Sequence, residues 1–195
     1  KVWLEDWSVQ QSGPEQYRLQ AAAGEVSLDL TLADSKGPVL QGENGYSQKG
    51  PGEGNASMYY SLSRLLSEGT VIIGDTAYTV QGSSWMDHEF STSALSGNQV
   101  GWDWFALQLD NGYELMVYTI RDSAGKVDPY SRGTWIDPQG GSAALLAEDF
   151  YITVTDTWQS PHTGAVYSAG WTIEVPGEGI SLQIKDPARD HFRGG

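Results

Sequence analysis

Apolar and polar residues alternate along most of this chain, in short runs separated by turn-forming residues. The segment Val26 to Leu32 is the clearest case, because valine and leucine take every second position and the turn-forming stretch 34–38 follows at once. A period of two places successive side chains on opposite faces of a strand. Repeated short runs of this kind predict an all-β domain of about twelve strands with little helix.

Two tight turns define neighbouring strands. Gly74-Asp75 separates the runs 70–73 and 78–80, and Asp110-Asn111-Gly112 separates 101–109 from 114–121. Glycine and asparagine accept the positive φ angles of hairpin turns, so the two runs of each pair are predicted to lie side by side and antiparallel.

A sheet of this many strands in meander order needs its edge strands paired or covered, because unpaired strand edges promote association between molecules. A closed barrel around a ligand cavity meets this need, and so does a two-sheet sandwich with no cavity. The periodicity alone favours neither arrangement over the other.

The composition excludes several classes of function. The 195 residues include 25 acidic and 11 basic side chains, a formal net charge of −14, so the chain lacks the basic footprint that nucleic acids and anionic membranes require. It contains no cysteine, which excludes disulfide scaffolds and thiolate chemistry. No run approaches the roughly 18 apolar residues of a membrane helix. The charge places no limit on an uncharged small-molecule partner.

Acid and base side chains gather in the segment Trp85-Met86-Asp87-His88-Glu89. Two carboxylates and an imidazole beside an indole suit general acid–base catalysis, because burial can tune their proton affinities. On a regular strand Asp87 and Glu89 would share one face, about 7 Å apart, and His88 would lie on the other. The alternative is that the carboxylates form a solvated face and His88 is a core residue.

The run 101–109 carries a second candidate group. Trp102, Trp104 and Gln108 fall on one face of this predicted strand, which favours a cavity wall with one polar side chain. The alternative is that the indoles only fill the space between two sheets.

A third candidate group lies on the run 57–66. Tyr60, Leu62 and Arg64 would align on one face there, placing a phenol beside a guanidinium. The guanidinium would either anchor an oxyanion of a ligand or form a surface ion pair with one of the many acids.

The sequence carries no metal or cofactor motif. The three histidines, His88, His162 and His191, lack the spacing of metal ligands, and the glycine-rich stretch 50–54 lacks the lysine of a phosphate loop. No Gly-x-Ser-x-Gly elbow is present, which excludes an α/β-hydrolase. We therefore expect neither a metal nor a cofactor.

Specific motifs occur over nearly the whole chain. They are Val2 to Trp7, Gln41-Gly42, Ser47 to Gly50, Tyr59 to Leu65, Trp85 to Thr92, Gly101 to Phe105, Gln108 to Leu109, Asn111 to Met116, Arg121, Trp158 to Pro161 and Thr163 to Ala165. Together they resemble the family of secreted hydrolases with lipocalin-like domains, which also includes carotenoid 1,2-hydratases and kievitone-hydratase-like proteins. Cyclases of the Diels–Alderase type share this architecture more distantly.

The resemblance implies an all-β protein with an antiparallel lipocalin-like β-barrel and part of a second barrel. Residues 1–137 would form the barrel that carries the Asp-His-Glu motif, and residues 138–195 the remaining strands. Family members carry two such barrels in tandem, so a chain with open barrel edges would be expected to form a homodimer. The resemblance also implies a secreted or periplasmic protein.

In function, the resemblance implies an enzyme that uses water on a lipophilic, uncharged small molecule. The first expectation is an ester hydrolase with His88 as general acid or base, oriented by Asp87 or Glu89, and with Ser61, Ser63 or Ser91 as nucleophile. The alternatives are a hydratase that protonates a carbon–carbon double bond, a non-catalytic carrier and a cyclase. The expected substrate-binding residues are Trp85, Trp102, Trp104, Gln108, Tyr60 and Arg64.

Overall fold

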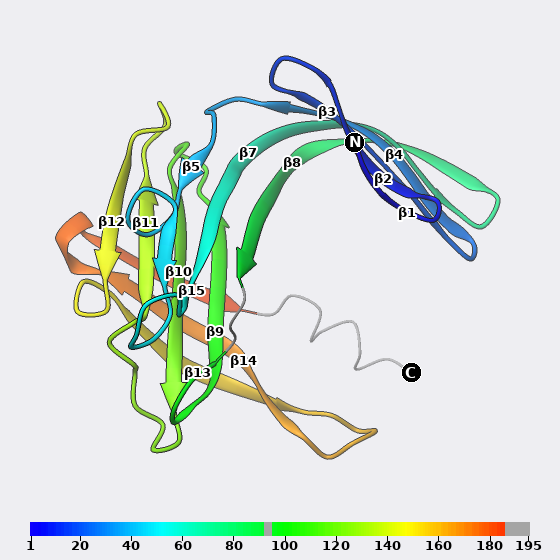
Figure 1. Ribbon diagram of the computed structural model, residues 1–195. Helices are drawn as coiled ribbons and strands as arrows, with labels where there is room; N and C mark the ends of the chain where they lie inside the picture. Colours follow the sequence, from blue (N-terminus) through cyan, green and yellow to red (C-terminus); the bar gives the residue numbers. More distant parts are fainter. Residues whose placement is uncertain (92–94, 186–195) are drawn as a thin grey trace.

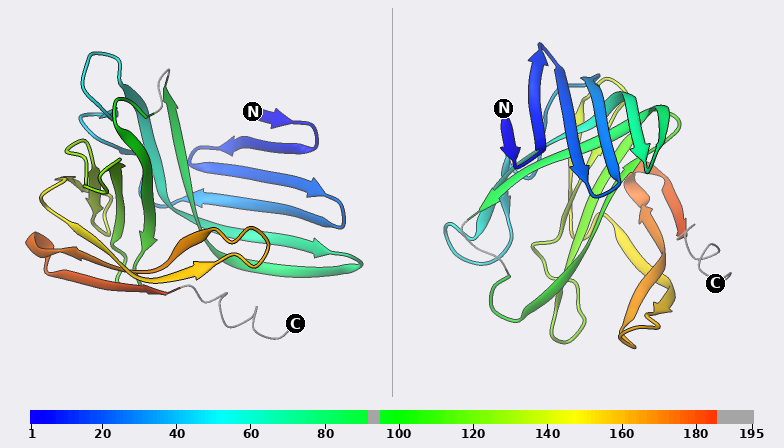
Figure 2. Two further views of the ribbon diagram at one scale, coloured as in Figure 1. Left: turned by 90° about the horizontal axis from the view of Figure 1, so that it is seen from below. Right: turned by 90° about the vertical axis from the view of Figure 1, so that its right-hand side faces the viewer.

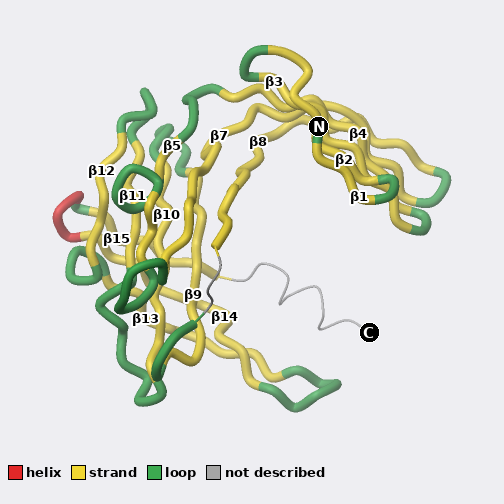
Figure 3. Tube along the Cα trace, viewed as in Figure 1, coloured by secondary structure: helices red, strands yellow, loops and turns green. Residues whose placement is uncertain are grey.

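The computed structural model describes residues 1–91 and 95–185, and strands account for nearly all of its regular structure (Figures 1 and 3). Every strand pairing is antiparallel, and the main sheet curls into a half-barrel. The prediction of an antiparallel all-β fold is therefore confirmed. The strands are β1 (Val2–Leu4), β2 (Trp7–Gly13), β3 (Gln16–Ala23), β4 (Val26–Asp34), β5 (Val39–Leu40), β6 (Tyr46–Gln48), β7 (Ala56–Ile73), β8 (Thr76–Ser91), β9 (Gln99–Gln108), β10 (Glu114–Asp122), β11 (Arg132–Ile136), β12 (Ser142–Leu146), β13 (Tyr151–Gln159), β14 (Val166–Val175) and β15 (Ile180–Lys185), with a 3-10 helix η1 (Pro176–Glu178).

The largest sheet is organised around the long hairpin of β7 and β8. Gly74, with a φ of 57°, forms the predicted turn between the two strands. The meander β1 to β4 pairs with the half of β7 next to this turn, while β5 and β6 pair with its other half. Figure 2 shows the meander projecting away from the smaller sheets. The hairpin therefore links a projecting layer to the part of the molecule that holds the core.

Two smaller sheets enclose the main core. One has the order β12-β11-β10-β9 and the other the order β13-β14-β15. Leu115 and Val117 of β10 are fully buried in a cluster with Ile173 and Val175 of β14. The predicted hairpin at 110–112 joins β9 to β10, as expected. The domain boundary expected after residue 137 falls in the turn between β11 and β12, which pair within one sheet.

A buried ionic cluster joins the largest sheet to the four-stranded one. Glu114 of β10 is fully buried, and its carboxylate accepts a hydrogen bond from Lys36 Nζ at 2.5 Å and another from Arg64 Nε. Lys36 also donates to the carbonyls of Gly112 and Asp137, at 2.5 and 2.9 Å. The cluster therefore surrounds one fully buried carboxylate with two cationic side chains, so that the buried negative charge is compensated.

A β-bulge on β7 brings Arg64 into this cluster. Leu62 pairs with Met86 and Leu65 pairs with Ser84, so Ser63 and Arg64 together face a single residue of β8. Both contact Glu114, Ser63 through its hydroxyl at 3.4 Å and Arg64 through its guanidinium. An inserted residue interrupts the alternation of faces along a strand. The prediction that Arg64 aligns with Tyr60 and Leu62 is wrong for this reason.

Replacing Glu114 by glutamine tests the structural role of the cluster. The change leaves the positive charge of Lys36, whose side chain is only 4% exposed, without a counter-charge. Breaking a buried ion pair in this way should lower the free energy of unfolding by about 3–5 kcal/mol. Urea denaturation followed by circular dichroism measures it. Glu178→Gln, at an exposed position of η1, should stay within about 0.5 kcal/mol of the wild type. An equally small change at Glu114 would contradict this role.

Candidate functional site

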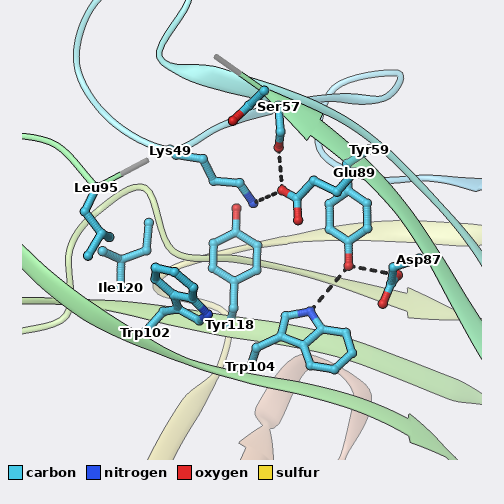
Figure 4. Close-up of a pocket in the computed structure, with 11 residues that line it drawn as sticks. Lys49, Ser57, Tyr59, Asp87, Glu89, Leu95, Trp102, Trp104, Tyr118 and Ile120 are labelled. Atoms are coloured by element: carbon cyan, nitrogen blue, oxygen red, sulfur yellow. Dashed lines mark hydrogen bonds and ion pairs between the residues drawn. The ribbon is translucent and has the colours of Figure 1, made fainter. Parts of the chain in front are cut away.

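A pocket of about 570 Å³ opens between the hairpin β7–β8 and the strands β9 and β10 (Figure 4). Its walls come from distant parts of the chain, and its lining combines aromatic rings with two carboxylates and one ammonium group. The lining residues are Lys49, Ser57, Tyr59, Asp87, Glu89, Ser91, Leu95, Trp102, Trp104, Tyr118 and Ile120.

Asp87 is the most strongly hydrogen-bonded group of the pocket. Its Oδ1 accepts three hydrogen bonds, from Ser61 Oγ at 2.5 Å, Tyr59 Oη at 2.9 Å and Trp85 Nε1 at 3.0 Å. Among the described residues, none donates a hydrogen bond to Oδ2. Three donors on one oxygen fix the orientation of the carboxyl group, since each bond restrains the plane of the group. The second oxygen is left for a molecule in the pocket.

Tyr59 connects Asp87 to the aromatic wall. This residue is 3% exposed, and its hydroxyl donates to Asp87 and accepts from Trp104 Nε1 at 3.3 Å. Burial, together with the negative charge of Asp87, raises the pKa of Tyr59 well above its ordinary value. The hydroxyl therefore keeps its proton and remains a donor to Asp87.

A second polar group surrounds Glu89. Its Oε1 accepts from Ser57 Oγ at 2.5 Å and lies 3.1 Å from Lys49 Nζ. The ammonium of Lys49 also lies 4.0 Å from the ring centroid of Tyr118, a distance suited to a cation–π contact. The pocket thus has two carboxylates with different partners, Asp87 with neutral donors and Glu89 with a cation.

The structure confirms the predicted faces of β8 and β9. Asp87 and Glu89 point into the pocket, and His88 lies on the opposite face. Trp102 and Trp104 line the pocket while 58% and 41% of their surfaces stay exposed, which favours the cavity-wall interpretation over interior packing.

The proposed pairing of His88 with Ser61 is not formed. The imidazole of His88 stacks on the ring of Tyr60, with centroids 5.1 Å apart, and meets Phe90 edge-on at 5.4 Å. Ser61 is fully buried on the other face of the hairpin, where its hydroxyl donates to Asp87. Strand alternation separates the two residues, so the structure provides no serine–histidine pair here. Tyr60, one of the expected binding residues, likewise lies with His88 and outside the pocket lining.

Two other expected binding residues serve the fold. Gln108 Nε2 donates to the carbonyls of Ser63 and Ser84, at 2.7 and 3.0 Å, and thereby ties β9 to the hairpin. Arg64 is engaged with Glu114 and with the carbonyl of Leu109 at 2.9 Å. Of the alternative serines, Ser63 contacts Glu114. Ser91 lines the pocket.

Sequence reasoning missed several lining residues, chiefly Tyr59, Lys49 and Tyr118. Tyr59 precedes Tyr60 on β7 and pairs with Glu89, so a correct register for the hairpin would have found it. Lys49 lies in the glycine-rich stretch 41–55, where no periodicity predicts the direction of a side chain. Tyr118 sits within the fully buried run of β10 and looks like a core residue.

Within residues 1–91 and 95–185, no three potential metal ligands cluster together. The same residues contain no helix long and apolar enough to cross a membrane.

The raised pKa of Tyr59 predicts a dependence of stability on pH. In the unfolded chain tyrosine ionises near pH 10, while native Tyr59 keeps its proton at higher pH. The contribution of Tyr59 to the free energy of unfolding is complete below about pH 10. Above about pH 10 the free energy of unfolding should fall by about 1.4 kcal/mol per pH unit, because the unfolded chain loses the tyrosine proton while the native protein keeps it. Tyr59→Phe should lack this part of the slope, whereas Tyr78→Phe, at an exposed position, should keep it. Urea unfolding across alkaline pH compares them, and equal slopes in all three proteins would refute the prediction.

The comparisons with known proteins agree with one another on the family of this chain. The AttH-like family matches residues 1–191. The crystal structure of a candidate AttH protein from Nitrosomonas europaea is 32% identical, with a TM-score of 0.83 over 89% of this chain and 54% of that one. Kievitone hydratase of Fusarium solani subsp. phaseoli is 24% identical over 171 residues, which are 85% of this chain and 47% of the relative. The crystal structure of kievitone hydratase from Nectria haematococca shares the fold, with 17% identity and a TM-score of 0.70 over 91% of this chain and 55% of that one.

The chain thus spans about half the length of the relatives that it matches. The resemblance noted from the sequence motifs is confirmed, because kievitone hydratase is among the matching proteins. With a family match over residues 1–191, this chain belongs to the AttH-like family.

Proposed function

We propose that this chain adds water across a carbon–carbon double bond of an apolar small molecule held in the pocket, with Asp87 transferring the proton. The observation that carries the proposal is the arrangement of Asp87, whose Oδ1 is held by three donors while Oδ2 accepts no hydrogen bond from any described residue. Two of the proteins that the chain resembles are hydratases by name, which supports the same type of reaction.

The reaction begins with protonated Asp87 giving its proton from Oδ2 to one alkene carbon. The electrons of the double bond form the new C–H bond, and the other carbon becomes cationic. The three donors to Oδ1 stabilise the carboxylate that remains, in the manner of preorganised dipoles. Water then bonds to the cationic carbon and gives a proton to the carboxylate of Glu89. Return of this proton to Asp87 through water completes the cycle.

The aromatic wall supports the cationic stage. The indoles of Trp102 and Trp104 line the pocket together with the phenol of Tyr118. Electron-rich ring faces attract a cation through their quadrupoles, and tryptophan does so most strongly. The same rings bind an apolar substrate by excluding water from it. An isoprenoid or aryl alkene fits both requirements.

Ester hydrolysis by a serine nucleophile receives less support. Ser61 is fully buried and does not line the pocket, and its hydroxyl is already engaged with Asp87 and Gln41. A nucleophilic serine needs a base within hydrogen-bond reach, whereas His88 lies on the opposite face of β8.

Replacing Asp87 by asparagine should remove most of the activity. The variant protein is incubated with geraniol, farnesol and 4-vinylphenol, and mass spectrometry detects products that have gained one water molecule. Loss of a general acid should lower the rate by about 10²- to 10⁴-fold. Asp75→Asn, in the exposed turn between β7 and β8, is the matched control and should keep the wild-type rate. Full activity of Asp87→Asn would rule out the proposed mechanism.

A binding measurement separates an enzyme from a carrier. Geraniol should quench tryptophan fluorescence in the wild type and in Asp87→Asn with similar dissociation constants, because the aromatic wall is intact in both. Trp104→Ala should raise the dissociation constant about tenfold or more, since an indole face of the pocket is lost. Binding without water addition by the wild type to any of the three alkenes would favour the carrier interpretation instead.

A further inference from the structure

Three buried polar side chains approach Asp87 from outside the pocket. Thr134 of β11 is 3% exposed, while Gln41, between β5 and β6, and Ser61 of β7 are fully buried. Thr134 Oγ1 donates to Gln41 Oε1 at 2.5 Å, and Gln41 Nε2 donates to Ser61 Oγ at 2.9 Å. Ser61 Oγ then donates to Asp87 Oδ1 at 2.5 Å. We call these three residues the Thr134–Gln41–Ser61 relay.

The bonds of the relay all run in one direction. Because the amide oxygen of Gln41 accepts from Thr134, its nitrogen faces Ser61 and donates to it. The Ser61 hydroxyl therefore accepts from the amide, and its own single proton is directed to Asp87. Reversing one member would leave a buried donor or acceptor unpaired, away from water, which is costly. The hydroxyl of Thr134 thus determines that the hydroxyl of Ser61 donates to Asp87.

The backbone keeps the amide of Gln41 in place. The main-chain N–H of Gln41 donates to the carbonyl of Tyr59 at 3.0 Å, next to the pairing of Leu40 with Tyr60. Gly42 follows with a φ of 65°, and a Cβ there would lie 2.5 Å from the carbonyl oxygen of Tyr46. The chain can make this close turn only with glycine, and the turn sets Gln41 between β7 and β11.

We propose that Thr134 and Gln41 are positioning residues for Asp87, which hold the Ser61 proton on Oδ1 and so reserve Oδ2 for the substrate. Without this donor the carboxyl group is freer to rotate and exchange its two oxygens. Without Thr134, the amide of Gln41 can turn and present its oxygen to Ser61, which then competes with Asp87 for the Ser61 proton. The inference deepens the proposed function and rests on the role given there to Asp87.

The relay can be tested without a substrate. Trp85 Nε1 donates to the same Oδ1, so its indole N–H signal in proton–nitrogen NMR reports on this carboxyl group. Thr134→Val and Ser61→Ala should each move the pH midpoint of this signal upward by ~0.5 pH unit or more, because a donor to the carboxylate is lost or misdirected. Thr134→Ser should restore the wild-type midpoint.

The other titratable groups of the pocket are unchanged in each variant, so they do not produce the difference; they are Tyr59, Tyr118, Glu89 and Lys49. Thr172→Val, in the separate sheet of β14, is the control for a threonine outside the relay and should leave the midpoint unchanged. An unchanged midpoint in Thr134→Val would overturn the inference even if Ser61→Ala shifts it, because the inference assigns the direction of the Ser61 proton to Thr134 and Gln41. An unchanged midpoint in Ser61→Ala would overturn it as well, so the inference stays falsifiable if one of the two variants fails to fold.

Turnover of geraniol supplies the second measurement. Thr134→Val should lower kcat about tenfold with little change in KM, and Thr134→Ser should rescue it. A fall in kcat without the NMR shift would contradict the relay, because the effect would not pass through Asp87. If Asp87→Asn keeps its activity while the Trp85 signal still shifts in Thr134→Val, the proposed function fails and the relay remains. The experiments can therefore refute the proposed function without refuting the relay, and refute the relay without refuting the proposed function.

Discussion

The register of the β7–β8 hairpin determines which chemistry reaches the pocket. The turn pairs Ile73 with Thr76, and regular pairing from there would place Ser61 opposite His88. The bulge at Ser63 and Arg64 shifts the register by one residue, so that Ser61 pairs with Asp87 instead. A shift of one residue exchanges the faces of a whole strand. The bulge therefore puts Tyr59 and Ser61 of β7 on the face of Asp87, to which both donate hydrogen bonds, and puts Tyr60 on the face of His88.

Glu114 links this register to the packing of the sheets. It contacts both residues of the bulge, and Lys36 completes the cluster from the segment after β4. A fully buried carboxylate is stabilised only while cationic partners compensate it, because without them its charge would be left unpaired in the core. The ion cluster thus acts on the site at a distance, by holding the bulge that decides which residues of β7 share a face with Asp87.

The alternation of side chains along the sequence correctly predicted the faces of single strands, which depend only on neighbouring residues. The alternation in 85–91 and 101–109 placed Asp87, Glu89, Trp102 and Trp104 on the correct faces, because strand periodicity needs only adjacent residues. The bulge escaped prediction because Glu114, which contacts both of its residues, lies 50 residues from Arg64 in the sequence. Lys49 and Gln41 escaped for a related reason, since their positions follow from contacts of an irregular segment rather than from a period.

The polar part of the site depends on contacts between two sheets. Both the Glu114 cluster and the Thr134–Gln41–Ser61 relay run from the four-stranded sheet to the hairpin β7–β8. The aromatic wall stands on β9 of the four-stranded sheet, which Gln108 ties to the same hairpin. The distance between Asp87 and the indoles is therefore set by inter-sheet hydrogen bonds that are largely shielded from water. Such bonds break only at a high cost, so the same contacts that join the sheets also hold the acid in line with the wall that would bind its substrate.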